Sequence, residues 1–166
     1  IDRRGKYLLC YTDHGCMIMH LGMSGSLRII NKNIKPEKHD HLDIMFASGN
    51  ILRFHDPRRF GSVIWTRKDP LQHKLIKDLG PEPLSKDFNG TWLYKRSRKR
   101  TQAVKNFIMV SHNVVGVGNI YASESLFLAG INPKRKAGNV SLERYENLAS
   151  AIKEILNQSI KQGGTT

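Results

Sequence analysis

The stretch with the clearest chemical meaning is residues 113–124, where an apolar segment meets two glycines and then a segment of helical character. Glycines let a backbone approach a ligand closely, and the start of a helix offers amide N–H groups that have no helical acceptor. This combination is typical of an anion-binding site. Asn119, directly after the second glycine, is placed to grip one phosphate together with the helix N-terminus. The alternative is that Asn119 only caps the helix.

The charge of the chain indicates which anion to expect. Lys and Arg number 27 against 14 Asp and Glu, a net charge of +13 at pH 7, which favours nucleic-acid phosphate. Five cations fall within the six residues 95–100, and Lys105 follows on the next predicted helix. A basic run is often just a solvated face, but beside the glycine turn we expect it to give a second phosphate contact.

Two loops in the first half carry side chains suited to entering a base stack. One, residues 20–25, holds Met23 between glycines, and the other, residues 55–61, holds two arginines and Phe60 between a proline and a glycine. Apolar wedges unstack a base step, and an arginine replaces the lost hydrogen bonds. The alternative is that Met23 and Phe60 fill the core. In either case we expect Asp56 to orient an arginine or cap its turn.

A histidine pair and a cysteine pair suggest a metal site and a disulfide, but the rest of the sequence supports neither. His39 and His41 have the spacing of two ligands on one face of a strand, but zinc needs three or four ligands and no others are evident. We therefore expect no metal in this chain. Cys10 and Cys16 flank a predicted turn where they could face each other, yet they form no Cys-x-x-Cys pattern. Free buried thiols are expected rather than a disulfide.

The elements that must position these residues change character along the chain. Residues 1–66 contain short apolar or alternating runs separated by glycine turns, which favours an antiparallel sandwich or barrel. Strands are predicted over residues 7–11, 17–21, 27–30, 42–46, 51–54 and 63–65.

From about residue 70 the apolar spacing becomes helical. A short helix is predicted over residues 70–79, a second around Trp92 with Ser85 or Asp87 as its cap, and a third over residues 103–110. The last two are expected over residues 119–128, closed by Gly130, and from a Ser141 cap to Gly163. The predicted fold class is α+β: part of a β-sandwich lobe (1–66), a connector (67–84) and a helical lobe with a helix–two-turn–helix motif (85–166).

The lengths of the apolar runs limit where the protein is expected to act. No apolar run approaches ~18 residues and no secretory signal is visible, so neither a membrane partner nor export is expected. The chain lacks an initiator Met and stops just past a helix, which suggests an internal part of a longer protein.

Several long motifs, in this order, resemble the bacterial formamidopyrimidine-DNA glycosylase family over essentially the whole chain. They are Arg3-Arg4-Gly5-Lys6-Tyr7-Leu8-Leu9, the loop 20–26, Lys38-His39-Asp40-His41, residues 56–61, Leu79-Gly80-Pro81-Glu82-Pro83-Leu84 and residues 114–127. The glycine turn is shared with the endonuclease VIII relatives, whereas the set Met23, Arg58 and Phe60 favours the formamidopyrimidine branch.

The resemblance implies a base-excision repair enzyme that removes oxidised purines such as 8-oxoguanine from duplex DNA and cuts the abasic strand by β,δ-elimination. It implies that Met23, Arg58 and Phe60 fill the gap left by the flipped nucleotide, with Arg58 facing the orphaned cytosine. The DNA-binding residues implied in all are His20, Met23, His39, Arg58, Arg59, Phe60, Lys99, Lys105, Asn119 and Tyr121, with Tyr121 and Glu124 close to the damaged nucleotide or supporting the turn.

The chemistry of the resembled family also implies parts outside this chain. Its nucleophile is an N-terminal proline followed by a glutamate acid, expected before Ile1, and its four-cysteine zinc finger is expected after Thr166. Lys6 is expected near the abasic site, assisting proton transfer or phosphate binding, because an ordinary lysine is protonated at pH 7 and is a poor nucleophile. Zn²⁺ is thus expected only in the full-length protein, and this chain alone is expected to be nearly inactive.

The resemblance and the charge together give the expected setting, a monomer acting on damaged double-stranded DNA in the bacterial cytoplasm. The alternative function is a non-catalytic, basic RNA- or DNA-binding module. That alternative fits the charge equally well, but it leaves the Met23 and Phe60 loops unexplained.

Overall fold

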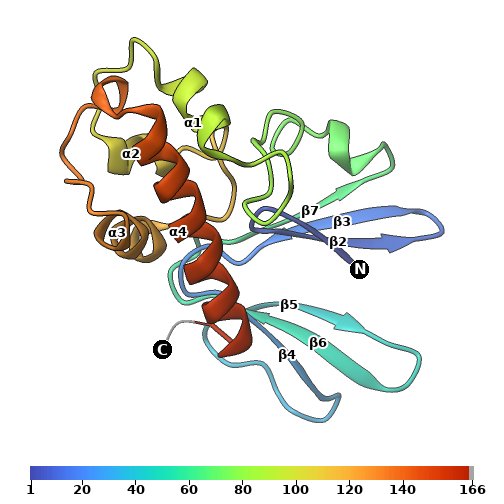
Figure 1. Cartoon of the computed structure of the whole chain (residues 1–166). Coiled ribbons are helices and arrows are strands. Elements are labelled where there is room, and N and C mark those ends of the chain that lie inside the picture. The colour runs from blue at the N-terminus through green and yellow to red at the C-terminus, as the bar shows by residue number, and fades with distance from the viewer. Residues whose placement is uncertain (165–166) are drawn as a thin grey trace. The chain divides into compact units, whose positions relative to one another are not determined.

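The chain forms two compact units in a computed structural model that describes residues 1–164, with the first unit spanning Ile1–His73 and the second beginning at Lys74 (Figure 1). The first unit is built of strands and the second of helices. This confirms the predicted α+β class. Among the described residues, no helix is both long enough and apolar enough to cross a membrane.

The first unit consists of two antiparallel sheets. One has the order β1-β2-β3-β7 and the other β4-β6-β5. Leu9 and Ile18, which pair across β2 and β3, lie on one face of their sheet and are 2% and 1% exposed. The strands are β1 (Asp2–Arg4), β2 (Tyr7–Thr12), β3 (Gly15–His20), β4 (Ser26–Asn31), β5 (Asp40–Met45), β6 (Asn50–His55) and β7 (Ser62–Thr66).

The register of the β2–β3 hairpin separates the two cysteines. Cys10 lies opposite Met17, whereas Cys16 lies opposite Tyr11. Because successive side chains of a strand point to opposite faces, Cys10 and Cys16 project from different faces of the sheet. Both thiols are free, as expected, but only Cys16 is buried. The expectation that they could face each other was wrong.

A buried arginine organises the second sheet. Arg53, on the central strand β6, is 3% exposed and makes two 2.8 Å hydrogen bonds to the carboxylate of Asp43. It also donates to the Asp40 carboxylate and to the carbonyl oxygens of Lys35 and Ile34, at 3.0–3.3 Å. A buried guanidinium is tolerated only when its donors are satisfied in this way. The loop that leads to His39 is therefore fastened to the sheet.

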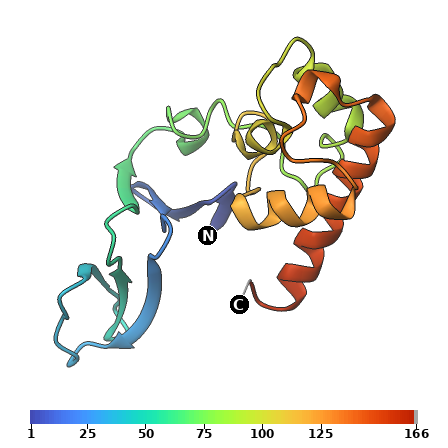
Figure 2. The same cartoon turned by 90° about the vertical axis from the view of Figure 1, so that its left-hand side faces the viewer.

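The second unit is a cluster of four helices, α1 (Gly90–Ser97), α2 (Val104–Met109), α3 (Asn119–Leu128) and α4 (Leu142–Lys161). The long helix α4, red in Figures 1 and 2, packs against both α1 and α3. Its apolar stripe supplies the core residues Tyr145, Leu148 and Ile152, each at most 1% exposed. The residues that join them in the core come from all the other helices and include Leu93, Phe107, Ile108 and Leu126.

Two helix predictions need correction. The helix expected over residues 70–79 is only a 3-10 turn at Pro70–Gln72, because Leu71 is exposed and no continuous apolar stripe follows. The cap of α1 is Asn89, whose side chain accepts from the Trp92 N–H, rather than Ser85 or Asp87. The Ser141 cap of α4 is confirmed, and the left-handed backbone at Gly130 and Gly163 ends α3 and α4 as predicted.

Candidate nucleic-acid interface

One buried carboxylate ties together the two loops that carry the predicted wedges. Asp56 is 1% exposed. It accepts the Gly61 N–H at 2.7 Å within its own loop and the Ser24 hydroxyl at 3.2 Å from the loop between β3 and β4. Hydrogen bonds from Gly61, Ser24 and the backbone of Arg58 and Arg59 hold the pKa of Asp56 below its usual range, against the opposing effect of burial.

Glycines allow these loops to touch through their backbones. A Cβ added to Gly22 would lie 2.6 Å from the carbonyl carbon of Phe60, and one added to Gly61 would lie 2.8 Å from the His20 oxygen. Gly22 also has a left-handed φ of +66°. The two loops therefore behave as one rigid support.

Three predicted wedge residues project from this support. Met23 and Phe60 are 72% and 63% exposed, so the alternative that they fill the core is excluded. The Arg58 guanidinium lies 5.8 Å from the centre of the Phe60 ring, and its Nε donates to the Ser24 hydroxyl at 3.4 Å. The structure thus brings Met23, Arg58 and Phe60 onto one pair of loops.

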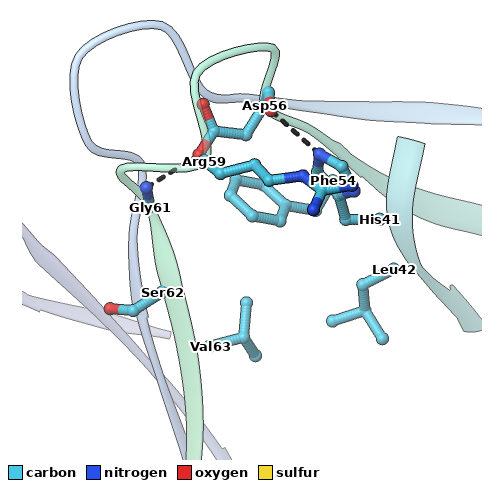
Figure 3. A pocket seen from close by; sticks show the side chains of 8 residues that line it. All are labelled: His41, Leu42, Phe54, Asp56, Arg59, Gly61, Ser62 and Val63. Atoms are coloured by element: carbon cyan, nitrogen blue, oxygen red, sulfur yellow. Dashed lines mark hydrogen bonds between the residues drawn. The ribbon is translucent and has the colours of Figure 1, made fainter. Parts of the chain in front are cut away.

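Arg59 has a different position from its neighbour. Its φ of +56° is left-handed, a conformation that costs a non-glycine residue about 1–2 kcal/mol. Its side chain lines a pocket of about 400 Å³ and reaches across Phe54 in Figure 3. His41 also lines that pocket, and its Nε2 donates to the Asp56 carbonyl at 2.9 Å. The backbone conformation of Arg59 therefore gives its side chain a different place from those of Met23, Arg58 and Phe60.

Lys6 and His20 come close together beside these loops. Lys6 is exposed on the turn between β1 and β2, and the ring of the next residue, Tyr7, packs at a tilt against the His20 ring with their centres 4.9 Å apart. Burial, and then the charge of Lys6, lower the pKa of His20. Its Nδ1 accepts the Gly22 N–H at 3.0 Å, which leaves Nε2 to carry the proton. At pH 7 His20 is thus a neutral N–H donor.

His39 and His41 do not form a metal site. His39 precedes β5 and packs edge-on against His55 at 5.8 Å, while His41 is bound to the Asp56 carbonyl. Residues 1–164 contain no group of three His, Cys, Asp or Glu side chains that could hold a metal ion. Within these residues the donors around His39 and His41 therefore do not make up a zinc ligand set.

In the second unit a buried amide shapes the glycine turn between α2 and α3. Asn113 is 7% exposed; its Nδ2 donates to the Phe107 carbonyl at 2.7 Å, and its Oδ1 accepts from Arg96 Nε at 3.0 Å. Trp92 Nε1 donates to the Asn113 carbonyl at 2.7 Å. Sequence reasoning missed this network, whose only sequence signal is a polar residue leading into an apolar run.

The anion site predicted at this turn has the expected backbone. The glycine turn reaches a left-handed φ of +80° at Gly116, and α3 then begins at Asn119. Gly118 occupies the cap position and no side chain caps the helix, so Asn119 is not a cap. Its side chain is exposed at the first helical position, beside the free N–H groups of the helix start. Lys105 lies at the start of α2 with its side chain half-buried.

Tyr121 lies further along α3. Its hydroxyl is 2.5 Å from the Ser159 Oγ of α4, and the pair lines a pocket of about 220 Å³ with Glu124 and Ile120. Tyr121 therefore both supports the packing of α3 on α4 and borders a small cavity.

The basic run divides into two kinds of cation. Arg96 and Arg98 hold the fold: Arg98 donates to the Tyr94 and Val140 carbonyls at 3.1 and 2.9 Å. Lys95, Lys99 and Arg100 are exposed. Lys99 has a left-handed φ of +62°. The alternative of a merely solvated face therefore does not describe the whole run.

Comparison with known proteins gives two family matches that together cover most of the chain. Residues 1–63 match the formamidopyrimidine-DNA glycosylase N-terminal domain, and residues 79–166 match the formamidopyrimidine-DNA glycosylase H2TH domain. Formamidopyrimidine-DNA glycosylases of Alcanivorax borkumensis and Teredinibacter turnerae are 58% and 61% identical, over 100% and 99% of this chain. The chain spans 61% of the length of each of these relatives.

Solved structures of similar proteins contain DNA. Lactococcus lactis formamidopyrimidine-DNA glycosylase, bound non-covalently to DNA with an AP site, matches with a TM-score of 0.90 and 36% identity over 99% of this chain and 64% of that one. The same enzyme with DNA containing Fapy-dG matches with a TM-score of 0.89 and 37% identity, over 99% of this chain and 62% of that one.

Replacing Asp56 tests whether its charge holds the two loops together. Asp56→Asn is expected to lower the free energy of unfolding at pH 7 by about 1.5–3 kcal/mol, the value of hydrogen bonds to a charged group. Because the folded-state pKa is lowered, this stabilisation is full above the unfolded pKa near ~3.9 and is lost as pH falls below it.

The measurement is urea denaturation of the full-length protein and its variant from about pH 7 to about pH 2. Asp13→Asn, at an exposed carboxylate on the β2–β3 turn, is the matched control and should change little at any pH. A difference between Asp56→Asn and wild type that stayed constant across this range would show that the carboxylate charge is not what holds the loops.

Proposed function

We propose that this chain, which belongs to the formamidopyrimidine-DNA glycosylase family, is the DNA-gripping part of a base-excision repair enzyme that removes oxidised purines from duplex DNA. The observation that carries the proposal is the pair of loops fixed by Asp56, with Met23, Arg58 and Phe60 exposed on them. Similar proteins bound to DNA with an AP site or Fapy-dG support it.

The loops suit a duplex from which one nucleotide has been flipped. Met23 and Phe60 are apolar and exposed, so they replace the stacking that the flipped base leaves behind. Arg58 is oriented by Ser24 and Phe60 through Nε and its planar face, which leaves its terminal nitrogens to donate to the unpaired base opposite. The resemblance to the family implies that this partner is cytosine, and we propose the same for this chain.

Contacts to the DNA backbone are proposed in each of the two units. In the first unit His20, His39 and Arg59 are proposed to contact phosphates, His20 as a neutral donor. In the second unit Asn119, the free N–H groups at the start of α3, and Lys105 are proposed to hold one phosphate, with Lys99 holding another. Tyr121 is proposed to lie close to the damaged nucleotide.

The covalent chemistry requires a neutral amine that attacks the sugar C1′ and forms a Schiff base. We place that amine, the family's N-terminal proline, and its glutamate acid in the part of the protein outside these residues, together with a structural zinc site. Lys6, exposed beside His20, is proposed to assist at the abasic site rather than to act as the nucleophile.

The full-length protein is proposed to act as a monomer on the chromosome in the bacterial cytoplasm. A basic RNA- or DNA-binding module would use the same charge, but it would have no need of rigidly held, exposed Met23 and Phe60. The two functions give different results in the experiments below.

Base release tests the activity directly. Full-length protein is expected to release 8-oxoguanine from a duplex and cut the strand, and borohydride is expected to trap a covalent adduct that persists in Lys6→Ala. Loss of the adduct in Lys6→Ala but not in an Arg67→Ala control would make Lys6 the nucleophile. No base release, with tighter binding to structured RNA than to duplex DNA, would favour the binding module.

Arg58→Ala tests the role of the wedge. The ratio of affinities for a duplex with an abasic-site analogue and an intact duplex is expected to fall by about fivefold or more, since a good base contact is worth about 1–3 kcal/mol. Affinity for the intact duplex should change modestly. Arg67→Ala, at an exposed arginine just after β7, should leave the ratio unchanged. An unchanged ratio in Arg58→Ala would remove Arg58 from lesion recognition.

Salt dependence separates His20 from Lys105. Lys105→Gln is expected to lower the slope of log K against log salt by about 0.9, because one phosphate contact is lost. His20→Gln should weaken binding at pH 7 without changing the slope, because the lowered pKa keeps His20 neutral. The assay is fluorescence anisotropy at several salt concentrations. A slope change in His20→Gln at pH 7 would mean that His20 binds as a cation.

A further inference from the structure

An unusual hollow lies at the end of α1. It has a volume of about 450 Å³, and all five residues that line it are cations: Lys95, Arg96, Arg98, Lys99 and Arg100. No residue of the sheet unit and no acidic residue contributes to its lining. A concave surface lined only by positive charge focuses the field on whatever enters it.

Two of these cations are held in place before any ligand arrives. The Arg98 guanidinium lies 3.8 Å from the centre of the Tyr94 ring and donates through Nη2 to the Ser97 hydroxyl at 2.8 Å. The Arg96 guanidinium lies 5.0 Å from the Trp92 ring centre, with its Nε bound to the Asn113 amide. The Arg98 Nη2 is fully used by Ser97 and the Val140 carbonyl, whereas the Arg98 Nη1 and both terminal nitrogens of Arg96 remain available to a ligand. A ligand therefore pays less side-chain entropy to bind them.

The backbone at Arg98 and Lys99 adopts a turn that non-glycine residues disfavour. Arg98 has φ −57° and ψ 139°, Lys99 has φ +62°, and the Arg100 N–H donates to the Ser97 carbonyl at 2.9 Å. These values define a type II turn in which Lys99 occupies the position that normally takes glycine. Strained non-glycine residues of this kind concentrate at binding sites.

A second basic segment is fastened beside the first. The N–H groups of Gly138 and Ala137 donate to the Arg100 and Gln102 carbonyls at 2.9 Å, and the Val104 N–H donates to the Arg135 carbonyl at 2.8 Å. The buried Tyr145 hydroxyl anchors this segment through the Ala137 carbonyl. Lys134, Arg135 and Lys136 are therefore held alongside the first basic segment.

None of these eight cations has a carboxylate partner among the described residues; the partners of their side chains are carbonyls, an amide, a hydroxyl and aromatic rings. Cations crowded together without anions repel one another, and an incoming polyanion removes that cost while releasing its own counterions.

We propose that the basic cradle, defined as residues 95–100 with residues 134–136, is a second phosphate-binding site that grips the backbone of duplex DNA in addition to the glycine turn. Taking DNA as the ligand rests on the proposed function. The cradle contains no wedge and no exposed aromatic tip, so it should read charge alone and bind damaged and undamaged DNA equally.

The test compares two triple variants of the full-length protein that remove the same charge. Lys95→Gln/Arg100→Gln/Lys136→Gln removes exposed cradle side chains without a hydrogen-bond partner in the described part of the chain. Lys32→Gln/Lys68→Gln/Lys77→Gln removes three exposed lysines elsewhere. Binding to intact duplex and to duplex with an abasic-site analogue is measured over a range of salt, and a thermal melt confirms folding.

The cradle triple is expected to lower the salt slope by about 2–3, at about 0.9 per phosphate contact, for both duplexes alike. The control triple should change it much less, and the ratio of the two duplex affinities should be the same in all three proteins. Equal slopes in the two triples would overturn the cradle. If the wild-type protein showed no preference for the duplex with the abasic-site analogue, the proposed repair function would be refuted. The cradle would still be tested, because its evidence is the difference in salt slope between the two triple variants.

Discussion

The two loops that carry Met23, Arg58 and Phe60 depend on one buried carboxylate. Asp56 cannot stay ionised at 1% exposure without donors, and it takes them from both loops at once. Each loop is therefore fixed only while the other is in place. This arrangement keeps Met23 and Phe60 in water, although burying either against its own sheet would be favourable. The rigid backbone of the two loops, rather than the preference of the side chains for the core, keeps Met23 and Phe60 exposed.

The helical unit solves a similar problem with a neutral group. The Asn113 side-chain amide is buried and bound on both sides, by the Phe107 carbonyl and by Arg96, while Trp92 binds its backbone. One residue thus joins α1 and α2 to the turn that starts α3. A backbone phosphate site needs its N–H groups held still, because an anion gains little from donors that must first be ordered.

Local patterns predicted most of the elements but few of the ties between them. Strand alternation and the stripe of α4 are visible within short windows, as is the Ser141 cap. The cap of α1 was misplaced because several polar residues precede that helix, and tertiary packing at Gly90 against Glu146 selects the one used. Asn113 was missed because its partners lie 6 to 21 positions away, beyond any periodic signal.

The site also shows where sequence rules for backbone give way. Arg59 and Lys99 are the two non-glycine residues with positive φ among the described residues, and both are basic. Glycine would hold either turn at lower cost, so folding alone gives no reason for an arginine or a lysine there. A positively charged side chain at such a position becomes stabilising only when an anion binds it. If Arg59 and Lys99 contact phosphates as proposed, DNA binding offsets this backbone cost, once in each unit of the chain.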